Sequence, residues 1–168
     1  MYKRQGLDRP NLSFRVIHGA DRKDFILRYV QNHGKESGII YCATRKAVDE
    51  IYEMLASRKI KAGRYHAGME DNARKKEQED FSFDRIHVMV ATNAFGMGID
   101  KSNVRYVLHY QMPKSMEAYY QEAGRAGRDG AKAECILLYS GQDVGIQRYL
   151  IESGTQTDGQ KQMDYDRL

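Results

Sequence analysis

Two arginines separated by glycines carry the strongest chemical signal in this chain. Residues 121–130 read QEAGRAGRDG, so that Arg125 and Arg128 alternate with Gly124 and Gly127. Arginine is always charged, and its guanidinium donates parallel hydrogen bonds that suit the oxygens of a transferring phosphate. A glycine costs roughly 1 kcal/mol in a helix interior relative to alanine. The two glycines therefore favour a special backbone at the end of a helix over an ordinary solvated basic helix end.

Gln121 precedes these arginines at a helical spacing. Gln121, Arg125 and Arg128 stand at i, i+4 and i+7, so a helix continued through the segment would present all three on one face. Gln121 has two interpretations, a contact in a ligand cleft or packing on the helix face. Asp129 follows Arg125 by four residues, where it could hold that guanidinium or form an ordinary exposed salt bridge.

A second candidate site is the glycine-containing loop at 92–100, which follows an apolar strand. Ligands of parallel α/β sheets gather at the carboxyl ends of strands, and Gly96 and Gly98 permit close approach of a backbone to a phosphate. The segment is not a dinucleotide fingerprint, because the pattern GxGxxG would need a glycine where Lys101 stands. Asp100 either faces a ligand or caps a turn.

A third candidate site combines Thr44 and Arg45 with His66. Thr44 and Arg45 follow another apolar strand at the expected start of a helix, which is a natural anion site. Thr44 is equally suited to cap that helix. His66, in the sequence YHAGM, could bind a phosphate or a neighbouring loop, although a lone histidine is more often structural.

Strands and helices are expected to alternate along the chain. Apolar runs and alternations predict strands at 12–18, 38–42, 60–65, 86–91, 104–109 and 133–139. Helices are expected after Asp21 and after Thr44, and at 70–81, 115–123 and 141–152. This order predicts parallel βαβ units, that is, an α/β fold with a mostly parallel sheet and helices on both faces.

Composition excludes some classes of protein and leaves others open. The 168 residues suit a single domain, and the net charge of +4 is compatible with a polyanionic partner without identifying one. Cys42 and Cys135 lie in apolar runs and are predicted to be reduced core residues, which favours an intracellular compartment. No apolar run has the length of a membrane span, and no cluster has the spacing of metal ligands.

Four segments together resemble the RecQ family of DNA helicases, within helicase superfamily two. In the order of that family they are GIIYCATRKAVDEI at 38–51, YHAGM at 65–69, VATNAFGMGIDKSNVRYV at 90–107 and YYQEAGRAGRDG at 119–130. They fall within residues 10–150. The resemblance implies a RecA-like domain, the second of the two that form a helicase motor, with helicase motifs IV, V and VI.

The resemblance also implies roles for the candidate residues. Arg128 is expected to be the arginine finger, and Arg125 a second contact to the γ-phosphate or to the other motor domain. Gln121, Gly98 and Asp100 are expected to face the ATP cleft. The DNA backbone is expected to contact Thr44, Arg45, His66 and Thr92.

The sequence lacks two parts that a complete ATPase needs. It contains no GxxxxGK[ST] phosphate loop and no Asp-Glu-x-His motif to hold magnesium. We therefore expect this chain alone to be inactive, with ATP and Mg²⁺ bound mainly by a first motor domain that precedes it. The expected organisation is a polar lead-in at 1–9, the second RecA-like domain at 10–153 and a flexible tail at 154–168.

The implied partners are the first motor domain, single-stranded and duplex DNA, and no membrane. The resemblance implies 3'-to-5' unwinding in DNA repair and recombination, located in the cytoplasm or nucleoid of a bacterium or in a eukaryotic nucleus. One alternative is an RNA helicase of the same superfamily, although DEAD-box proteins usually begin motif VI with histidine where Gln121 stands. Another alternative is a non-catalytic nucleic-acid-binding module, which would not need both arginines.

Overall fold

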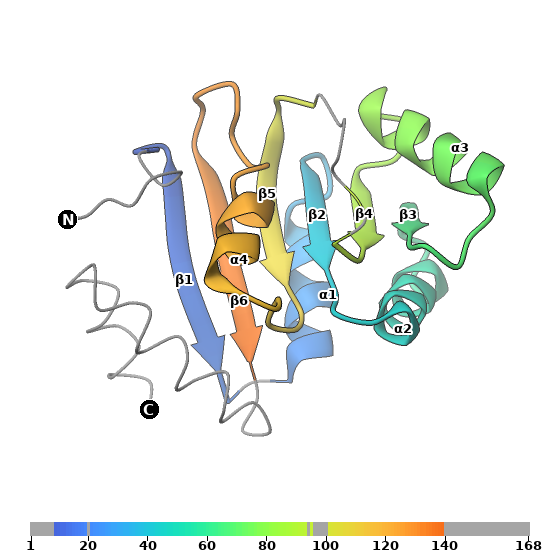
Figure 1. Ribbon diagram of the computed structural model, residues 1–168, viewed down its shortest axis with the longest axis horizontal. Coiled ribbons are helices and arrows are strands. Elements are labelled where there is room, and N and C mark those ends of the chain that lie inside the picture. Colours follow the sequence, from blue (N-terminus) through green and yellow to red (C-terminus); the bar gives the residue numbers. More distant parts are fainter. Residues whose placement is uncertain (1–8, 20, 94, 96–100, 140–168) are drawn as a thin grey trace.

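Six parallel strands form one sheet in the computed structural model, which describes residues 9–19, 21–93, 95 and 101–139. The strands are β1 (Leu12–His18), β2 (Ser37–Tyr41), β3 (Ala62–Tyr65), β4 (Val88–Ala91), β5 (Val104–His109) and β6 (Ala133–Tyr139). Their order across the sheet is β1-β6-β5-β2-β4-β3 (Figure 1). Every pairing is parallel, so all the carboxyl ends lie along one edge of the sheet.

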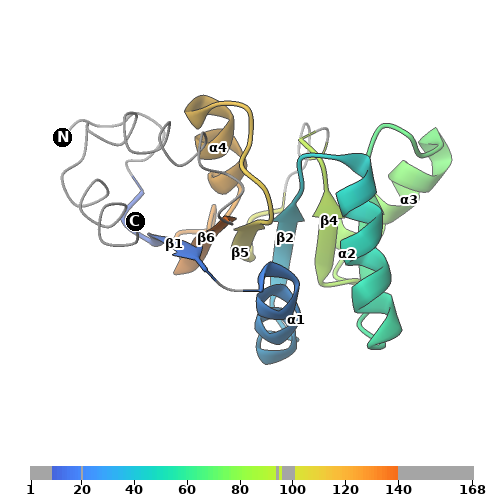
Figure 2. The ribbon, with the colours of Figure 1, turned by 90° about the horizontal axis from the view of Figure 1, so that it is seen from below.

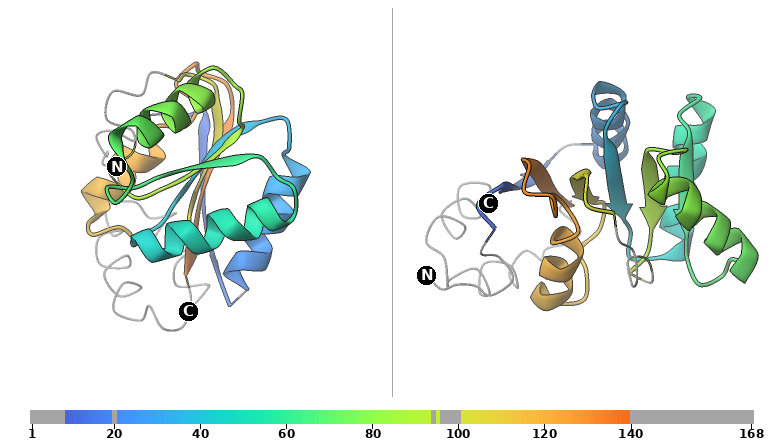
Figure 3. Two further views of the ribbon diagram at one scale, coloured as in Figure 1. Left: turned by 90° about the vertical axis from the view of Figure 1, so that its right-hand side faces the viewer. Right: turned by 90° about the horizontal axis from the view of Figure 1, so that it is seen from above.

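Helices cover both faces of this sheet. They are α1 (Arg22–Asn32), α2 (Arg45–Ser57), α3 (Asp71–Ser82) and α4 (Met116–Ala123). Helices α1 and α2 lie on one face, and α3 and α4 lie on the other (Figures 2 and 3). The predicted α/β fold with a parallel sheet and two helical layers is confirmed.

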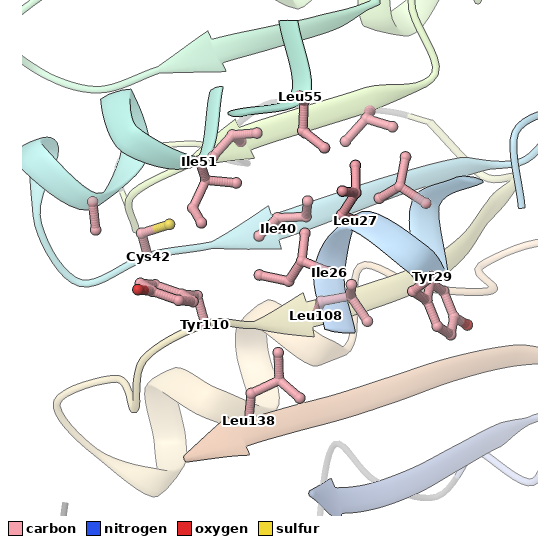
Figure 4. Packing of buried hydrophobic residues seen from close by; sticks show 14 of the residues in the cluster. Ile26, Leu27, Tyr29, Ile40, Cys42, Ile51, Leu55, Leu108, Tyr110 and Leu138 are labelled. Atoms are coloured by element: carbon pink, nitrogen blue, oxygen red, sulfur yellow. The ribbon is translucent and has the colours of Figure 1, made fainter. Parts of the chain in front are cut away.

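Alternating side chains of the central strands build a core on each face. Ile40 and Leu108 point to the α1/α2 side, where they pack with Ile26 and Ile51 (Figure 4). Neighbouring positions point to the α3/α4 side and pack with Phe81 of α3 and with α4. Because β2 and β4 are buried on both faces, their sequences are largely continuous apolar runs rather than alternations.

Side-chain caps fix the start of three helices. Asp21 accepts hydrogen bonds from the amides of the first turn of α1, as the sequence predicts. Thr44 caps α2 through the amide of Ala47 at 3.1 Å, and Ser115 caps α4 through the amide of Ala118 at 3.0 Å. The predicted helix at 141–152 and tail at 154–168 lie outside the described residues, as does the lead-in apart from Arg9.

Candidate nucleotide and nucleic-acid interface

The motif VI segment leaves the helical path soon after α4 ends at Ala123. The amides of Arg125 and Ala126 bond to carbonyls three residues earlier, and Gly127 adopts a left-handed backbone with φ of 58°. The predicted special backbone is confirmed for Gly127, whereas Gly124 has an ordinary helical conformation. Since the helix does not continue, the i+7 spacing does not place Arg128 on one helical face with Gln121.

The motif VI turn, residues 124–132, is tied to the rest of the sheet by its backbone. The amide of Gly127 donates to the carbonyl of Val104 at 2.8 Å, and the amide of Asp129 donates to that of Ser102 at 3.0 Å. Segment 101–104 directly follows the motif V loop, residues 92–100, in the sequence. Motifs V and VI are therefore joined through backbone hydrogen bonds at the start of β5.

Two residues near the start of the chain hold this turn, and sequence reasoning missed both. Arg9 donates to the carbonyls of Gly124 and Ala126 at 3.1 and 2.7 Å. Asn11 donates to the carbonyl of Gly127 at 2.8 Å. These carbonyls lie where a helix ends without intrahelical partners, so a cation and an amide there satisfy them. More than a hundred residues separate the partners, and no local pattern reveals such contacts.

Of the two interpretations of Asp129, the structure shows the salt bridge, and its partner is Arg105 rather than Arg125. Asp129 accepts from Arg105 of β5 at 2.6 Å and from the amide of Ala131 at 3.0 Å. The amide and the Arg105 guanidinium hold the pKa of Asp129 below its usual value. Arg105 also donates to the carbonyl of Lys132 at 2.8 Å, so this pair fastens the motif VI turn to β5.

Arg125 lies against a buried tyrosine on the α3/α4 face. Its positive charge acts on the hydroxyl of Tyr41, the last residue of β2, and lowers a pKa that burial and Glu122 raise. The Nε atom of Arg125 is buried and has no hydrogen-bond partner among the residues that the structure describes. Arg128, on the exposed part of the turn, also acts electrostatically on Tyr41. Gln121 is exposed on α4, which is contrary to helix-face packing and compatible with a cleft contact.

The predicted DNA contacts gather at the carboxyl edge of the sheet. The amide of Cys42 donates to the carbonyl of Ala91 at 2.8 Å, and that of Thr92 donates to Tyr65 at 3.2 Å. These bonds join the ends of β2, β4 and β3. Thr44, Arg45, His66 and Thr92 follow those three ends directly.

Arg45 and His66 come close together beside Gly68. A Cβ atom on Gly68 would lie 3.1 Å from His66 Cε1 and 3.3 Å from Arg45 Nη1. Both ring nitrogens of His66 have partners, Asp49 at 3.2 Å and the Gly68 amide at 3.1 Å. Because that amide donates to Nδ1, Nε2 carries the proton that points at Asp49. His66 is buried, which supports its structural interpretation, whereas Arg45 is exposed.

The described part of motif V packs into the core. Phe95 is 2 % exposed and meets the rings of Tyr65 and Phe81 edge-on, so the prediction that it packs is confirmed. Thr92 is buried, and its carbonyl accepts from the amide of Phe95. Gly98 and Asp100 lie outside the described residues.

Both cysteines are free and buried, as predicted. Burial raises the pKa of the Cys42 and Cys135 thiols to about 12. Within the described ranges, no group of three or more potential ligand side chains could hold a metal ion. None of the described helices combines the length and the apolarity that a membrane span requires.

Comparison with known proteins decides the family. Residues 6–130 match the model of the helicase conserved C-terminal domain. The chain belongs to this family. It is 57% identical over 157 residues to the ATP-dependent DNA helicase RecQ of Bacillus subtilis, covering 94% of this chain and 27% of that protein. The RecQ protein of Haemophilus influenzae is 46% identical over 146 residues, or 86% of this chain and 24% of that protein.

The RecQ resemblance seen in the sequence is thereby confirmed. This chain spans about a quarter of the length of these curated relatives. It is also 42% identical over 155 residues to a putative ATP-dependent RNA helicase of Acanthamoeba polyphaga mimivirus, covering 92% of this chain and 28% of that protein.

Solved structures give the fold independently. The Escherichia coli DEAD-box protein SrmB superposes with a TM-score of 0.72 at 21% identity, over 83% of this chain and 84% of that chain. A DEAD box protein from Methanococcus jannaschii superposes with the same score at 26% identity, over 84% of this chain and 39% of that chain. The RecQ-type helicase C-terminal domain thus has the expected RecA-like fold.

Proposed function

We propose that this domain is the second motor domain of a RecQ-type DNA helicase and supplies motif VI to an ATP site shared with a first motor domain. The observation that carries this proposal is the motif VI turn, which contains Arg125 and Arg128 and is tied by backbone hydrogen bonds to the start of β5. One donor of Arg125 is buried without a partner among the described residues. A buried unsatisfied donor is costly, and a phosphate oxygen brought by the other domain would satisfy it.

Arg128 is the proposed arginine finger, with Arg125 as the second contact. Stabilising charge that develops on the phosphoryl group in the transition state speeds hydrolysis by about 10³–10⁵ in related enzymes. Gln121, Gly98 and Asp100 are proposed to complete the cleft on this side. ATP and Mg²⁺ would be held mainly by the first domain, because the described residues offer no metal cluster.

The test is hydrolysis by the full-length helicase, meaning this domain within a chain of the length of its RecQ relatives. Arg128→Ala should lower DNA-stimulated ATP turnover by at least about 10³-fold while ATP affinity stays within a fewfold. Lys132→Ala, which removes another exposed cation from the same turn, is the control and should leave turnover unchanged. Normal turnover in Arg128→Ala would remove that residue from the finger role.

DNA is proposed to bind along the carboxyl edge, and this is the basis for translocation. Arg45 is exposed at the start of α2, where its charge and the free amides of the first turn favour a phosphate. Thr44, Thr92 and His66 lie along the same edge. The hydroxyl of Thr44 also accepts the hydrogen bond that caps α2. Binding through phosphates would be independent of base sequence.

Arg45→Ala in the full-length helicase should weaken single-stranded DNA binding and flatten the slope of log affinity against log salt by about one unit. Lys35→Ala is the matched control, because Lys35 is an exposed cation before β2, at the opposite edge of the sheet. If the two variants weaken DNA binding equally, Arg45 contributes only general electrostatic attraction, and a specific phosphate contact is contradicted.

The relative named as an RNA helicase provides a second candidate substrate. Stimulation of ATP turnover by single-stranded DNA and by RNA of equal length separates the two. We expect DNA to be the stronger activator. Unwinding in the 3'-to-5' direction and a role in DNA repair and recombination are parts of the same proposal.

A further inference from the structure

The guanidinium of Arg45 lies beside the turn that follows β3, residues 66–69. Gly68 in this turn leaves the room that the guanidinium occupies. A Cβ atom on Gly68 would lie 3.3 Å from Nη1 of Arg45 and 3.1 Å from Cε1 of His66, both closer than ordinary van der Waals contact. A residue with a branched side chain at this position would therefore have to displace either the guanidinium or the ring.

The ring of His66 fixes this turn against α2. Its Nδ1 accepts a hydrogen bond from the amide of Gly68 at 3.1 Å, and its carbonyl accepts one from the amide of Met69 at 3.1 Å. Its Nε2 donates to Oδ1 of Asp49 in α2 at 3.2 Å. Because both ring nitrogens are engaged and the residue is buried, the ring is held in place, and the turn is held with it.

Asp49 follows Arg45 by four residues on α2, a spacing at which an acid and a base commonly pair. Here its Oδ1 instead accepts from His66 and from Nη1 of Arg64 at 3.1 Å. The Arg64 guanidinium is itself held over the ring of Tyr52, 4.5 Å from its centroid. No carboxylate in the described part of the chain forms an ion pair with Arg45. The charge of Arg45 is thus confined in space and not neutralised.

We propose that Asp49, His66 and Gly68 are positioning residues for DNA binding, which together hold the Arg45 guanidinium at the carboxyl edge for a phosphate of the DNA backbone. The inference rests on the proposed function, in which Arg45 contacts DNA, and it gives His66 an indirect role there. A long side chain loses rotamer freedom when it binds a ligand, so a guanidinium that is already confined loses less. An ion pair between Asp49 and Arg45 would instead compete with the phosphate for the same donors.

The first test is Gly68→Val in the full-length helicase, which fills the space beside Arg45. The affinity for single-stranded DNA should fall by about threefold or more, and the slope of log affinity against log salt should flatten towards that of Arg45→Ala. The flattened slope is the readout that a change in fold stability alone would not produce. Unchanged affinity in Gly68→Val would overturn the proposal.

Gly34→Val is the matched control. Gly34 is exposed between α1 and β2, at the opposite edge of the sheet, and a Cβ atom there would meet only a backbone carbonyl at 3.8 Å, an ordinary contact. Neither Gly34 nor Gly68 has a positive φ, so valine meets no special backbone cost at one of them alone. DNA affinity should be unchanged in Gly34→Val. An equal loss in the two variants would overturn the specific role of Gly68.

Asp49→Ala gives a second test, in which positioning and simple electrostatics predict opposite results. Removing an acid near a polyanion site should by itself strengthen DNA binding. If Asp49 acts by holding His66 and the turn, its loss should instead weaken binding by about threefold, because Arg45 is no longer confined. Glu50→Ala is the control, since Glu50 is an exposed acid of the same helix, and it should bind DNA at least as tightly as the wild type. Affinity in Asp49→Ala equal to or above that of the wild type would overturn the proposal.

A double-mutant cycle with Arg45→Ala separates this inference from the proposed function. If Gly68 acts through Arg45, adding Gly68→Val to Arg45→Ala should change DNA affinity by less than about 1.5-fold. A full further loss would show that the turn acts by another route and would overturn its positioning role. If Arg45→Ala weakens binding but Gly68→Val does not, the positioning role alone fails. If Arg45→Ala leaves affinity unchanged, the proposed phosphate contact fails first, and the positioning role falls with it.

Discussion

Gly127 shows how one residue determines the course of motif VI. Its φ of 58° is a conformation that residues with a side chain rarely adopt. A Cβ atom there would also lie 2.6 Å from Nδ2 of Asn11 and 3.0 Å from the carbonyl of Ala131. Asn11 is one of the residues that hold the turn, so a methyl group at Gly127 would displace the turn and its restraint together.

Gly127→Ala should therefore lower the free energy of unfolding of this chain by more than about 2 kcal/mol, measured by urea denaturation. Gly130→Ala is the control. Gly130 has a φ of 88°, but a Cβ atom there would meet nothing within 4 Å, so only the backbone cost of about 1 kcal/mol applies. Equal losses in the two variants would contradict the steric part of this account.

Sequence patterns predicted the backbone of the motif VI turn better than the contacts of its side chains. Gly127 correctly indicated an unusual backbone, because few residue types tolerate a positive φ, whereas Gly124 is ordinarily helical. The partner of Asp129 was predicted from spacing alone, and the structure shows Arg105 instead. Spacing along a helix predicts contacts only while the helix continues, and here it ends at Ala123.

The N-terminus of α2 combines a structural and a proposed functional role at the scale of one element. Thr44 caps the helix through the amide of Ala47. Thr44→Ala should lower the free energy of unfolding by about 1 kcal/mol, and Thr44→Ser should restore most of it because serine caps equally well. Thermal or urea unfolding measures both. No loss in Thr44→Ala would mean that the cap contributes nothing to stability.

The link between the α3–β4 connection and the start of β5 depends on a buried cation. The ammonium of Lys101 lies 2.6 Å from Asp84, and the Lys101 side chain is 3 % exposed. The hydrogen bond from Lys101 holds the pKa of Asp84 below its usual value. A depressed pKa means that the pair stabilises the fold above the unfolded-state pKa of about 3.9, and that this contribution is lost as pH falls through the folded-state pKa.

Asp84→Asn should thus destabilise the chain by about 1–3 kcal/mol at pH 7, because it leaves a buried charge without its partner. The difference from the wild type should shrink as pH falls below about 4. Glu50→Gln is the control, since Glu50 forms an exposed pair with Lys23 at 3.6 Å that should contribute less than about 1 kcal/mol. A difference that does not depend on pH would contradict the role of the Asp84 charge.

The apolar patterns predicted some element boundaries correctly, whereas β3 and β4 begin two residues later than predicted and β2 begins and ends one residue earlier. The strands β1, β5 and β6 begin and end where the sequence indicates, and the first two helix caps are the predicted residues. In the sequence, Lys101 was notable only because it stands where the pattern GxGxxG would need a glycine. Its burial depends on Asp84 and Phe81, which no local window of sequence brings beside it.

At the scale of the molecule, the sheet separates two sets of candidate residues. The predicted DNA contacts follow the carboxyl ends of β2, β3 and β4, whereas Arg125 and Arg128 lie in the turn whose backbone bonds to the start of β5. The order of the motifs in the sequence predicted a shared α/β scaffold. It did not predict this spatial separation or the backbone hydrogen bonds that join motifs V and VI.

The central claim is that this domain completes an ATP site that it does not contain by itself. The most direct test measures DNA-stimulated ATP hydrolysis side by side for this chain alone, the full-length helicase, and the full-length Arg128→Ala variant. We predict turnover only in the unaltered full-length protein. Turnover by this chain alone, or undiminished turnover in the Arg128→Ala variant, would contradict the shared site.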